Sequence, residues 1–184
     1  MIILEGPDNS GKSTLAAKLK RDLGVRVVHS IRPPQGWTRK MVYEHCLKQI
    51  APQTESCILD RVTCISEAIY GPICRGESAL GNYQAEALLD LWSRPYTVIY
   101  CRPDDDVILD NQGREQMPGV LENHKRIIEA YDRLMEDLAR FATPYVFTYD
   151  WKDKTSYTQV KNLVNADKAR LASLVQSATF MSAP

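Results

Sequence analysis

The sequence predicts a single α/β domain in which a five-stranded parallel sheet is covered by helices on both faces, forming a three-layer sandwich. Short apolar runs recur along the chain, segments with helical periodicity separate them, and no linker, repeat or low-complexity tract divides it. Apolar runs without polar alternation are typical of strands buried on both faces of a parallel sheet. A length of 184 residues suits one such domain, which we expect to cover residues 1–175.

The strands are expected where runs of Val, Ile, Leu and aromatic residues are bounded by turn-forming or polar residues. They cover residues 1–4, 25–28, 57–59, 97–101 and 145–149. Segments with helical periodicity lie at 15–23, 37–50, 120–142 and 156–175. The last helix is expected to begin near Ser156, because Gln159 three residues later fits a capping box. Residues 176–184 would form a flexible tail.

The composition is that of a globular protein, which we expect in the cytoplasm. Hydrophobic residues make up 44% and charged residues 25% of the chain, and 23 basic residues balance 23 acidic ones. This balance gives no overall attraction to nucleic acid or an anionic membrane, and no apolar run approaches the roughly 18 residues of a membrane span. The five cysteines show no CxxC spacing and no secretory signal is recognisable, which favours a reducing compartment.

Residues 6–13, with the sequence GPDNSGKS, match the phosphate-binding motif GxxxxGK[ST] at every fixed position. A strand is predicted directly before the motif and an amphipathic helix from around Lys12, which is the context that the motif requires. Gly6 and Gly11 would let the backbone N–H groups turn toward the phosphates at the positive end of that helix. Lys12 would reach the β- and γ-phosphates, and the Ser13 hydroxyl would bind Mg²⁺. The other expected phosphate-binding residues are Asn9, Ser10 and Thr14.

Three classes of protein carry this motif: GTPase switches, motor-type ATPases and small-molecule kinases. A GTPase would need an Asn-Lys-x-Asp guanine-recognition motif after a late strand, and the chain has none. Motor ATPases usually have longer chains. A small-molecule kinase needs a second pocket for its acceptor and a mobile basic lid that excludes water. The sequence contains candidates for both features.

The second pocket is predicted at the end of the 57–59 strand, where Asp60 and Arg61 follow. Ligands of open parallel sheets bind at the carboxyl ends of the strands. Asp60 would hold Mg²⁺ through water or orient the attacking oxygen, and Arg61 would clamp an acceptor phosphate with two hydrogen bonds. The structural alternative is an ion pair that caps the following helix.

A lid is predicted over 111–119, where two glycines, a proline and one arginine lie between two helical segments. Arg114 would close on the phosphoryl group in transfer and neutralise its charge. Arg102, directly after the fourth strand, is the second candidate, with pairing to the acidic run 104–106 as its alternative role. Three histidines show no metal-ligand spacing and are interpreted as ordinary surface or core residues: His29, His45 and His124.

The opening segment, residues 3–14, resembles the start of thymidylate kinases, where an apolar run precedes Glu-Gly, a variable residue, Asp and the phosphate-binding lysine. In that family the Asp inside the loop contacts the acceptor sugar, and it falls on Asp8. The strand-end Asp-Arg pair falls on Asp60 and Arg61. Similarity to the substrate-side helix and loop, and to the Arg-x-Pro-Gly loop, is found at 66–71, 75–76 and 32–36. The resemblance implies a P-loop NTPase fold and these acceptor-binding residues: Asp8, Arg32, Arg61, Tyr70 and Arg75.

The chain departs from thymidylate kinases between Arg32 and Asp60, where it has room for one helix. Members of the family usually place a longer helical insertion there, with an aromatic residue that stacks on thymine. In this chain Trp37, Tyr43 or Tyr70 would stack on the base instead. A free nucleotide, a nucleoside, or a modified nucleotide inside a DNA strand would each suit such a pocket.

We expect a P-loop kinase that transfers the γ-phosphoryl group of ATP to a thymidylate-like deoxynucleoside monophosphate, with Mg²⁺ at Ser13 and Asp60. Lys12, Asp60, Arg61 and Arg114 would carry the reaction. One alternative is a phage-type kinase that phosphorylates a hydroxymethylated base, such as 5-hydroxymethyluracil, in DNA, which predicts a basic rim around the pocket. The other is a non-catalytic protein regulated by ATP. The expected setting is a bacterial or phage-infected cell, without membrane partners, and a homodimer is left open.

Overall fold

The computed structural model describes residues 1–31, 33–51, 55–110, 117–141 and 143–181. Its strands form one parallel five-stranded sheet with the order β2-β3-β1-β4-β5, as predicted. They are β1 (Ile2–Glu5), β2 (Arg26–His29), β3 (Cys57–Asp60), β4 (Thr97–Cys101) and β5 (Tyr145–Tyr149). Each lies within one residue of its predicted bounds, because the apolar runs that define the strands are short and sharply bounded.

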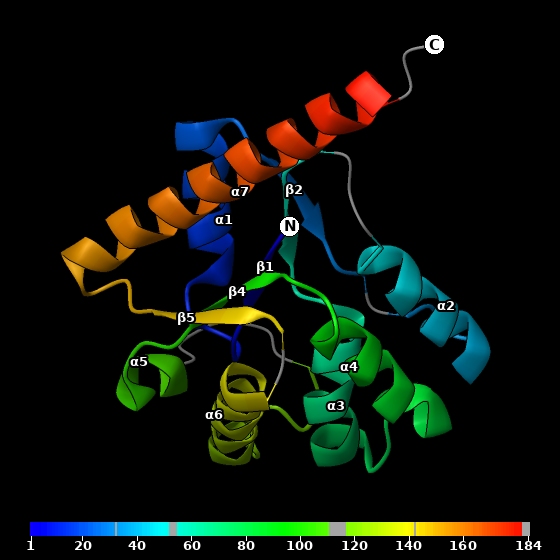
Figure 1. The fold of residues 1–184 in the computed structure, drawn as a ribbon. Helices are drawn as coiled ribbons and strands as arrows, with labels where there is room; N and C mark the ends of the chain where they lie inside the picture. Colours follow the sequence, from blue (N-terminus) through cyan, green and yellow to red (C-terminus); the bar gives the residue numbers. More distant parts are fainter. Residues whose placement is uncertain (32, 52–54, 111–116, 142, 182–184) are drawn as a thin grey trace.

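Helices cover both faces of this sheet (Figure 1). One face packs against α1 (Lys12–Leu23) and α7 (Lys154–Met181). The other packs against α2 (Arg39–Gln49), α3 (Thr63–Tyr70), α4 (Gln84–Trp92) and α6 (His124–Phe141). Successive residues of the central strand serve opposite faces: Ile2 and Leu4 lie in the first core, and Ile3 lies in the second. The predicted three-layer sandwich is confirmed.

Two helices differ from the predicted bounds for local reasons. The amphipathic pattern from residue 120 becomes helical only at His124, because Gly119 has φ +83° and residues 118–123 form turns. The last helix begins at Lys154 rather than near Ser156, since the Asp153 carboxylate accepts the Thr155 N–H at 2.8 Å. This helix continues to Met181, beyond residue 175, where no glycine or proline ends it.

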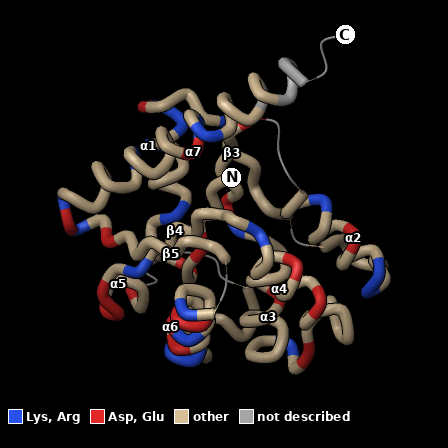
Figure 2. The backbone as a smooth tube through the Cα atoms, viewed as in Figure 1, with Lys and Arg blue, Asp and Glu red and all other residues tan. Residues whose placement is uncertain are grey.

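The sheet order places the loops after β1 and β3 side by side. The strands pair directly, with Leu4 opposite Asp60, so both loops leave the same edge of the sheet. The strand that follows β3 in the chain, β4, lies on the other side of β1. Ligand-binding crevices of open parallel sheets form where the strand order reverses in this way. Positions of both charge signs occur along the backbone, for example along α6 (Figure 2). No helix in the described part of the chain is both long and apolar enough to cross a bilayer.

Candidate active site

The phosphate loop follows β1, and its shape depends on backbone conformations that L-residues rarely adopt. Gly6 has φ +144°, Asn9 has φ +65° and Gly11 has φ +84°. At the first of these only glycine fits, because a Cβ atom on Gly6 would lie 2.4 Å from the carbonyl oxygen of Cys101 in β4. A loop with such left-handed positions at a helix N-terminus is typical of the backbone nests that bind phosphate.

Lys12 is the first residue of α1, and its side chain turns back into the loop, with 6% of the residue exposed. Its Nζ donates hydrogen bonds to the Pro7 carbonyl oxygen at 2.5 Å and to Ser10 Oγ at 3.2 Å. Burial, together with the positive charge of Arg61, lowers the pKa of Lys12 to about 8. Neutral oxygens are weaker partners for a buried ammonium group than a phosphate oxygen, so an anion bound in the loop would stabilise the charged lysine.

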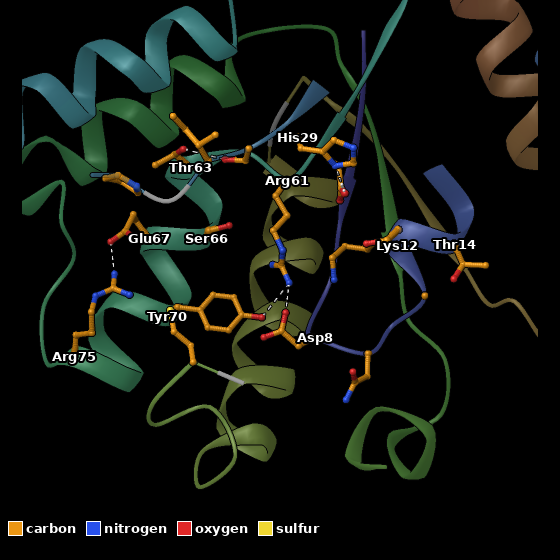
Figure 3. Close-up of a pocket in the computed structure, with 18 residues that line it drawn as sticks. Asp8, Lys12, Thr14, His29, Arg61, Thr63, Ser66, Glu67, Tyr70 and Arg75 are labelled. Atoms are coloured by element: carbon orange, nitrogen blue, oxygen red, sulfur yellow. Dashed lines mark hydrogen bonds and ion pairs between the residues drawn. The ribbon is translucent and has the colours of Figure 1, made fainter. Parts of the chain in front are cut away.

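Arg61 connects the phosphate loop to the opposite side of the site (Figure 3). It follows β3 with φ +71°, an uncommon value for a residue that carries a Cβ atom. Its guanidinium group donates hydrogen bonds to the Asp8 carboxylate at 2.6 Å, to the Tyr131 hydroxyl at 2.6 Å and to the Tyr70 hydroxyl at 3.3 Å. Burial alone would lower the pKa of Arg61, but these oxygen-bearing neighbours raise it overall, so the group stays charged.

Glu5, the last residue of β1, holds this network from the sheet and is fully buried. Its carboxylate accepts the Val62 N–H at 2.7 Å and the Tyr131 hydroxyl at 3.2 Å, and it lies 4.0 Å from a guanidinium nitrogen of Arg61. Burial raises the pKa of Glu5, and the charge of Arg61 opposes that rise. The orientation of the arginine is therefore fixed by a carboxylate and a tyrosine to which the sequence analysis gave no such role.

Asp60 ends β3 and lies opposite His29, the last residue of β2. The His29 Nδ1 and an Asp60 carboxylate oxygen are 2.9 Å apart. The histidine lies at the surface, as predicted, with 68% of its side chain exposed. It nevertheless lines the cavity and contacts the carboxylate predicted to serve the reaction, which no spacing in the sequence could reveal.

The wall across the cavity is formed by α3 and the π-helical segment η1 (Gly71–Arg75). Glu67 of α3 is 6% exposed, and its Oε2 accepts hydrogen bonds from Arg75 at 2.5 Å and from the Ala79 N–H at 2.8 Å. The following segment passes so close that a Cβ atom on Gly71 would lie 2.6 Å from Ser78 Cα. The wide turn returns Arg75 toward Glu67 (Figure 3), and π-helical turns of this kind are frequent at functional sites.

These elements enclose one cavity of about 600 Å³, a usual size for a small-molecule site. It is lined by most of the predicted site residues: Asp8, Asn9, Gly11, Lys12, Ser13, Thr14, Asp60, Arg61, Tyr70 and Arg75. Gly6 and Ser10 are buried within the phosphate loop itself. Arg32 and Arg114 lie outside the described residues. Lining residues that the sequence analysis did not assign include His29, Ser30, Thr63 and Glu67.

The other candidates for base stacking and charge stabilisation, Trp37, Tyr43 and Arg102, are not among the residues that line the cavity. Tyr70 lines the cavity, whereas the Trp37 ring packs edge-on against a histidine at 5.4 Å and Tyr43 stacks on a second tyrosine at 4.9 Å. Arg102 pairs with Asp132 at 2.8 Å and with Asp105 at 2.6 Å, so pairing with the acidic run 104–106 is confirmed for it.

The oxygen ligands available for Mg²⁺ fit a metal ion that is bound together with a nucleotide. Within the described residues, no group of three or more His, Cys, Asp or Glu side chains is arranged to hold a metal ion. Ser13, the second residue of α1, and Asp60, the last residue of β3, line the same cavity. Mg²⁺ is commonly bound by one or two protein oxygens together with substrate phosphates, so two protein ligands suffice here.

No protein-family model matches the chain. The SPbeta prophage-derived protein YorR of Bacillus subtilis (strain 168) is 29% identical over 156 residues, which are 82% of this chain and 87% of YorR. A crystal structure of YorR in complex with phosphorylated GDP superimposes with a TM-score of 0.67 and 26% identity, over 90% of this chain and 96% of that one.

Two further solved structures share the architecture at low identity. Deoxyadenosine kinase from M. mycoides with bound dATP has a TM-score of 0.58 at 17% identity, covering 89% of this chain and 98% of the kinase. Thymidylate kinase from Candida albicans has a TM-score of 0.54 at 14% identity, covering 91% of each chain. The fold is that of the P-loop nucleotide kinases. The resemblance to thymidylate kinase-like proteins with a phage link is thereby confirmed.

Proposed function

We propose that this protein is an ATP-dependent kinase that phosphorylates an acceptor of the deoxynucleoside class, either the nucleoside or the thymidylate-like monophosphate that the sequence predicts. The observation that carries the proposal is that one cavity joins a phosphate loop with its buried Lys12 to the strand end that bears Asp60 and Arg61. A phosphate loop alone would support nucleotide binding. The second wall, with Tyr70 and Arg75, adds space and polar groups for an acceptor.

The arrangement suits direct phosphoryl transfer between two bound substrates. An acceptor oxygen attacks the γ-phosphorus of ATP, the bond from that phosphorus to the β,γ-bridging oxygen breaks, and ADP leaves with the bonding electron pair. In this proposal Lys12 binds the β- and γ-phosphates, and Asp60 orients the acceptor oxygen or accepts its proton. Both residues line the cavity. Ser13 and Asp60 would hold Mg²⁺, which when bound supplies positive charge for the phosphates. Positioning and electrostatic stabilisation then account for the rate.

The similar proteins support a nucleoside or nucleotide as the ligand class. YorR is known in complex with phosphorylated GDP, and the two structural relatives of lower identity are a deoxyadenosine kinase and a thymidylate kinase. These names do not select between bases. Tyr70 lies in the wall formed by α3 and η1, which we call the acceptor wall, and it is the residue that we assign to contact the base.

Phosphorylation of a base inside DNA is less well supported by the charges near the acceptor wall. That function predicts a basic rim with cations free for the polymer backbone. In the described part of this region, Arg39 pairs with Glu77 at 2.7 Å and Arg75 pairs with Glu67 at 2.5 Å. The arginines are therefore already matched by carboxylates.

The proposal is tested by incubating the purified chain with γ-labelled ATP, Mg²⁺ and a panel of nucleosides, nucleoside monophosphates and DNA containing 5-hydroxymethyluracil. We expect acceptor-dependent transfer to a free nucleoside or nucleotide. Lys12→Ala should abolish transfer while the protein stays folded, because the proposal gives the lysine the role of binding phosphate and its side chain belongs to neither hydrophobic core. Lys20→Ala, on the exposed side of the same helix, is the matched control. ATP binding without transfer to any acceptor would instead indicate the non-catalytic alternative.

The lid remains a proposal of the same kind. Arg114 would contribute mainly in the transition state, so Arg114→Ala should lower turnover far more than it weakens ATP binding. Met117, which follows the predicted lid arginine in the chain, lines the cavity. Equal loss of both quantities would assign the arginine to substrate binding.

A further inference from the structure

His29 lines the cavity, although the proposed function has given it no role. It is the last residue of β2, and the parallel ladder places it directly opposite Asp60, the last residue of β3. The Ser30 N–H donates to the Asp60 carbonyl oxygen at 3.0 Å, so the pairing of the two chains continues past this point. The strand ends are therefore held in register where the two side chains meet.

The alternation of side chains along the two strands directs both residues to the same face of the sheet. The residue two positions before Asp60 is Ile58, which packs in the core on the face covered by α1 and α7. The residue two positions before His29 is Val27, which packs against the same core. Both side chains thus lie on the side of the sheet where α1 begins at the end of the phosphate loop.

The two side chains differ in burial and share one hydrogen bond. The Asp60 side chain is 11% exposed, whereas the histidine projects into solvent. The His29 Nδ1 lies 2.9 Å from Asp60 Oδ2 (Figure 3), and because an ionised carboxylate can only accept, Nδ1 carries the proton. Within the described part of the chain, no other side chain forms a hydrogen bond or an ion pair with this carboxylate.

This contact engages one carboxylate oxygen and leaves the other for a ligand. An aspartate side chain rotates about two bonds, so an oxygen that must meet a reacting hydroxyl group is better placed when a partner holds the other oxygen. His29 makes its contact from a strand that is hydrogen-bonded to β3, and partners on such rigid elements orient a reacting group more accurately than partners on loops.

We propose, on the basis of the kinase function above, that His29 is a positioning residue for phosphoryl transfer: its Nδ1–H holds Asp60 Oδ2 and thereby keeps Oδ1 oriented toward the acceptor oxygen. The histidine acts through the carboxylate and contacts neither substrate in this role. Loss of the hydrogen bond should lower kcat, because the carboxylate then adopts other orientations. The KM for ATP should stay nearly unchanged, because ATP is bound by the phosphate loop.

The structural alternative is that the contact only attaches β2, an edge strand of the sheet, to β3. Such a role would affect the stability of the protein and leave kcat per folded molecule unchanged. The two roles therefore predict different measurements on the same variants.

The test compares two substitutions by steady-state kinetics and thermal unfolding, with the acceptor identified by the panel above. His29→Leu removes the donor, whereas His29→Asn keeps one, because its amide nitrogen, like Nδ1, is bonded to Cγ. We expect kcat about tenfold lower in His29→Leu, with the KM for ATP changed less than about twofold, and kcat within about threefold of wild type in His29→Asn. Equal losses of kcat in the two variants would overturn the proposal. Tyr157→Phe, which loses a hydrogen bond to the Asp22 carboxylate at 2.7 Å outside the cavity, is the matched control and should keep the wild-type kcat.

A double-mutant cycle shows whether the histidine acts through the carboxylate. His29→Leu should lower kcat about tenfold when Asp60 is present, but less than about twofold in the Asp60→Asn background, where no carboxylate remains to be oriented. Equal effects in the two backgrounds would overturn the proposal and leave the kinase function standing. A lower midpoint of thermal unfolding with wild-type kcat in His29→Leu would do the same and assign the contact to the edge strand. Absence of transfer to any acceptor by the wild-type protein would overturn both the kinase function and the role of His29.

Discussion

Arg61 donates a hydrogen bond to the Asp8 carboxylate at 2.6 Å, and this ion pair joins the loop after β1 to the end of β3. The two residues are 53 positions apart in the chain, so the pair closes the site across two adjacent parallel strands. The same guanidinium also contacts Tyr131 and Tyr70, which brings α6 and α3 to the same point. The Arg61 side chain thus connects the phosphate loop, α3 and α6 around the cavity.

Replacing this arginine by lysine should show how much its forked geometry matters. Arg61→Lys keeps the charge, but a single ammonium group cannot reach Asp8, Tyr131 and Tyr70 together. We expect turnover to fall by roughly 10- to 100-fold, with a smaller loss of thermal stability, measured by steady-state kinetics beside thermal unfolding. Wild-type turnover in Arg61→Lys would show that the charge alone is sufficient.

The Asp60 carboxylate is expected to act in catalysis rather than in folding. Asp60→Asn keeps the shape of the side chain and removes its charge, so turnover should drop by roughly 10² or more. The midpoint of thermal unfolding should change little, because the partner of the Asp60 carboxylate, His29, is exposed to solvent and such contacts contribute little to stability. His29→Ala serves as a comparison that removes the contact and keeps the carboxylate. Lower stability with unchanged turnover in Asp60→Asn would instead indicate a structural role through the contact with His29; in the described structure α3 has no side-chain cap at its N-cap residue, so the predicted capping ion pair is not formed.

ATP affinity should decrease above pH 8 because of Lys12. Its pKa in the free protein is lowered to about 8 by burial, so the ammonium group that we propose to bind phosphate loses its proton as the pH rises through that value. Binding should be nearly constant below this pH and weaken by up to about tenfold per unit above it. Titration calorimetry from about pH 6.5 to about pH 9.5 measures the profile. In Lys12→Arg, whose guanidinium group does not titrate in this range, the profile should be flat; the same slope in both proteins would rule out the lysine as its origin.

The backbone of Gly6 lies so close to β4 that adding one methyl group there should destabilise the protein strongly. Gly6→Ala would place a Cβ atom 2.4 Å from the Cys101 carbonyl oxygen, in a backbone conformation with φ +144°. We expect a loss of about 2 to 3 kcal/mol in the free energy of unfolding, together with loss of ATP binding. Gly24→Ala is the matched control, because its φ is +64° but nothing lies within 4 Å of the added atom. It should cost about 1 kcal/mol and leave ATP binding unchanged, as measured by urea unfolding.

The parts of the molecule that follow from local sequence were predictable, and those that depend on distant contacts were not. The strand that ends at Glu5 and the phosphate loop after it are encoded in consecutive residues, and both are confirmed in place. The bond between Tyr131 and Glu5 joins residues 126 positions apart, and the helical pattern over 120–142 shows only that the tyrosine occupies one of its apolar positions. It is indeed fully buried, but its hydroxyl group also orients Arg61.

The width of the acceptor wall depends on the number of residues in the π-helical turn η1. A π-helical turn contains about one residue more than an α-helical turn, and the extra residue is accommodated between Gly71 and Arg75. Deleting a single residue there would favour a regular helix and rotate the following side chain by about 100° around the axis. Arg75 would then leave Glu67, even though every side chain in the cavity kept its identity. Related chains that differ by one insertion or deletion at 71–75 should therefore accept ligands of different size, a difference that point substitutions at these positions would not reproduce.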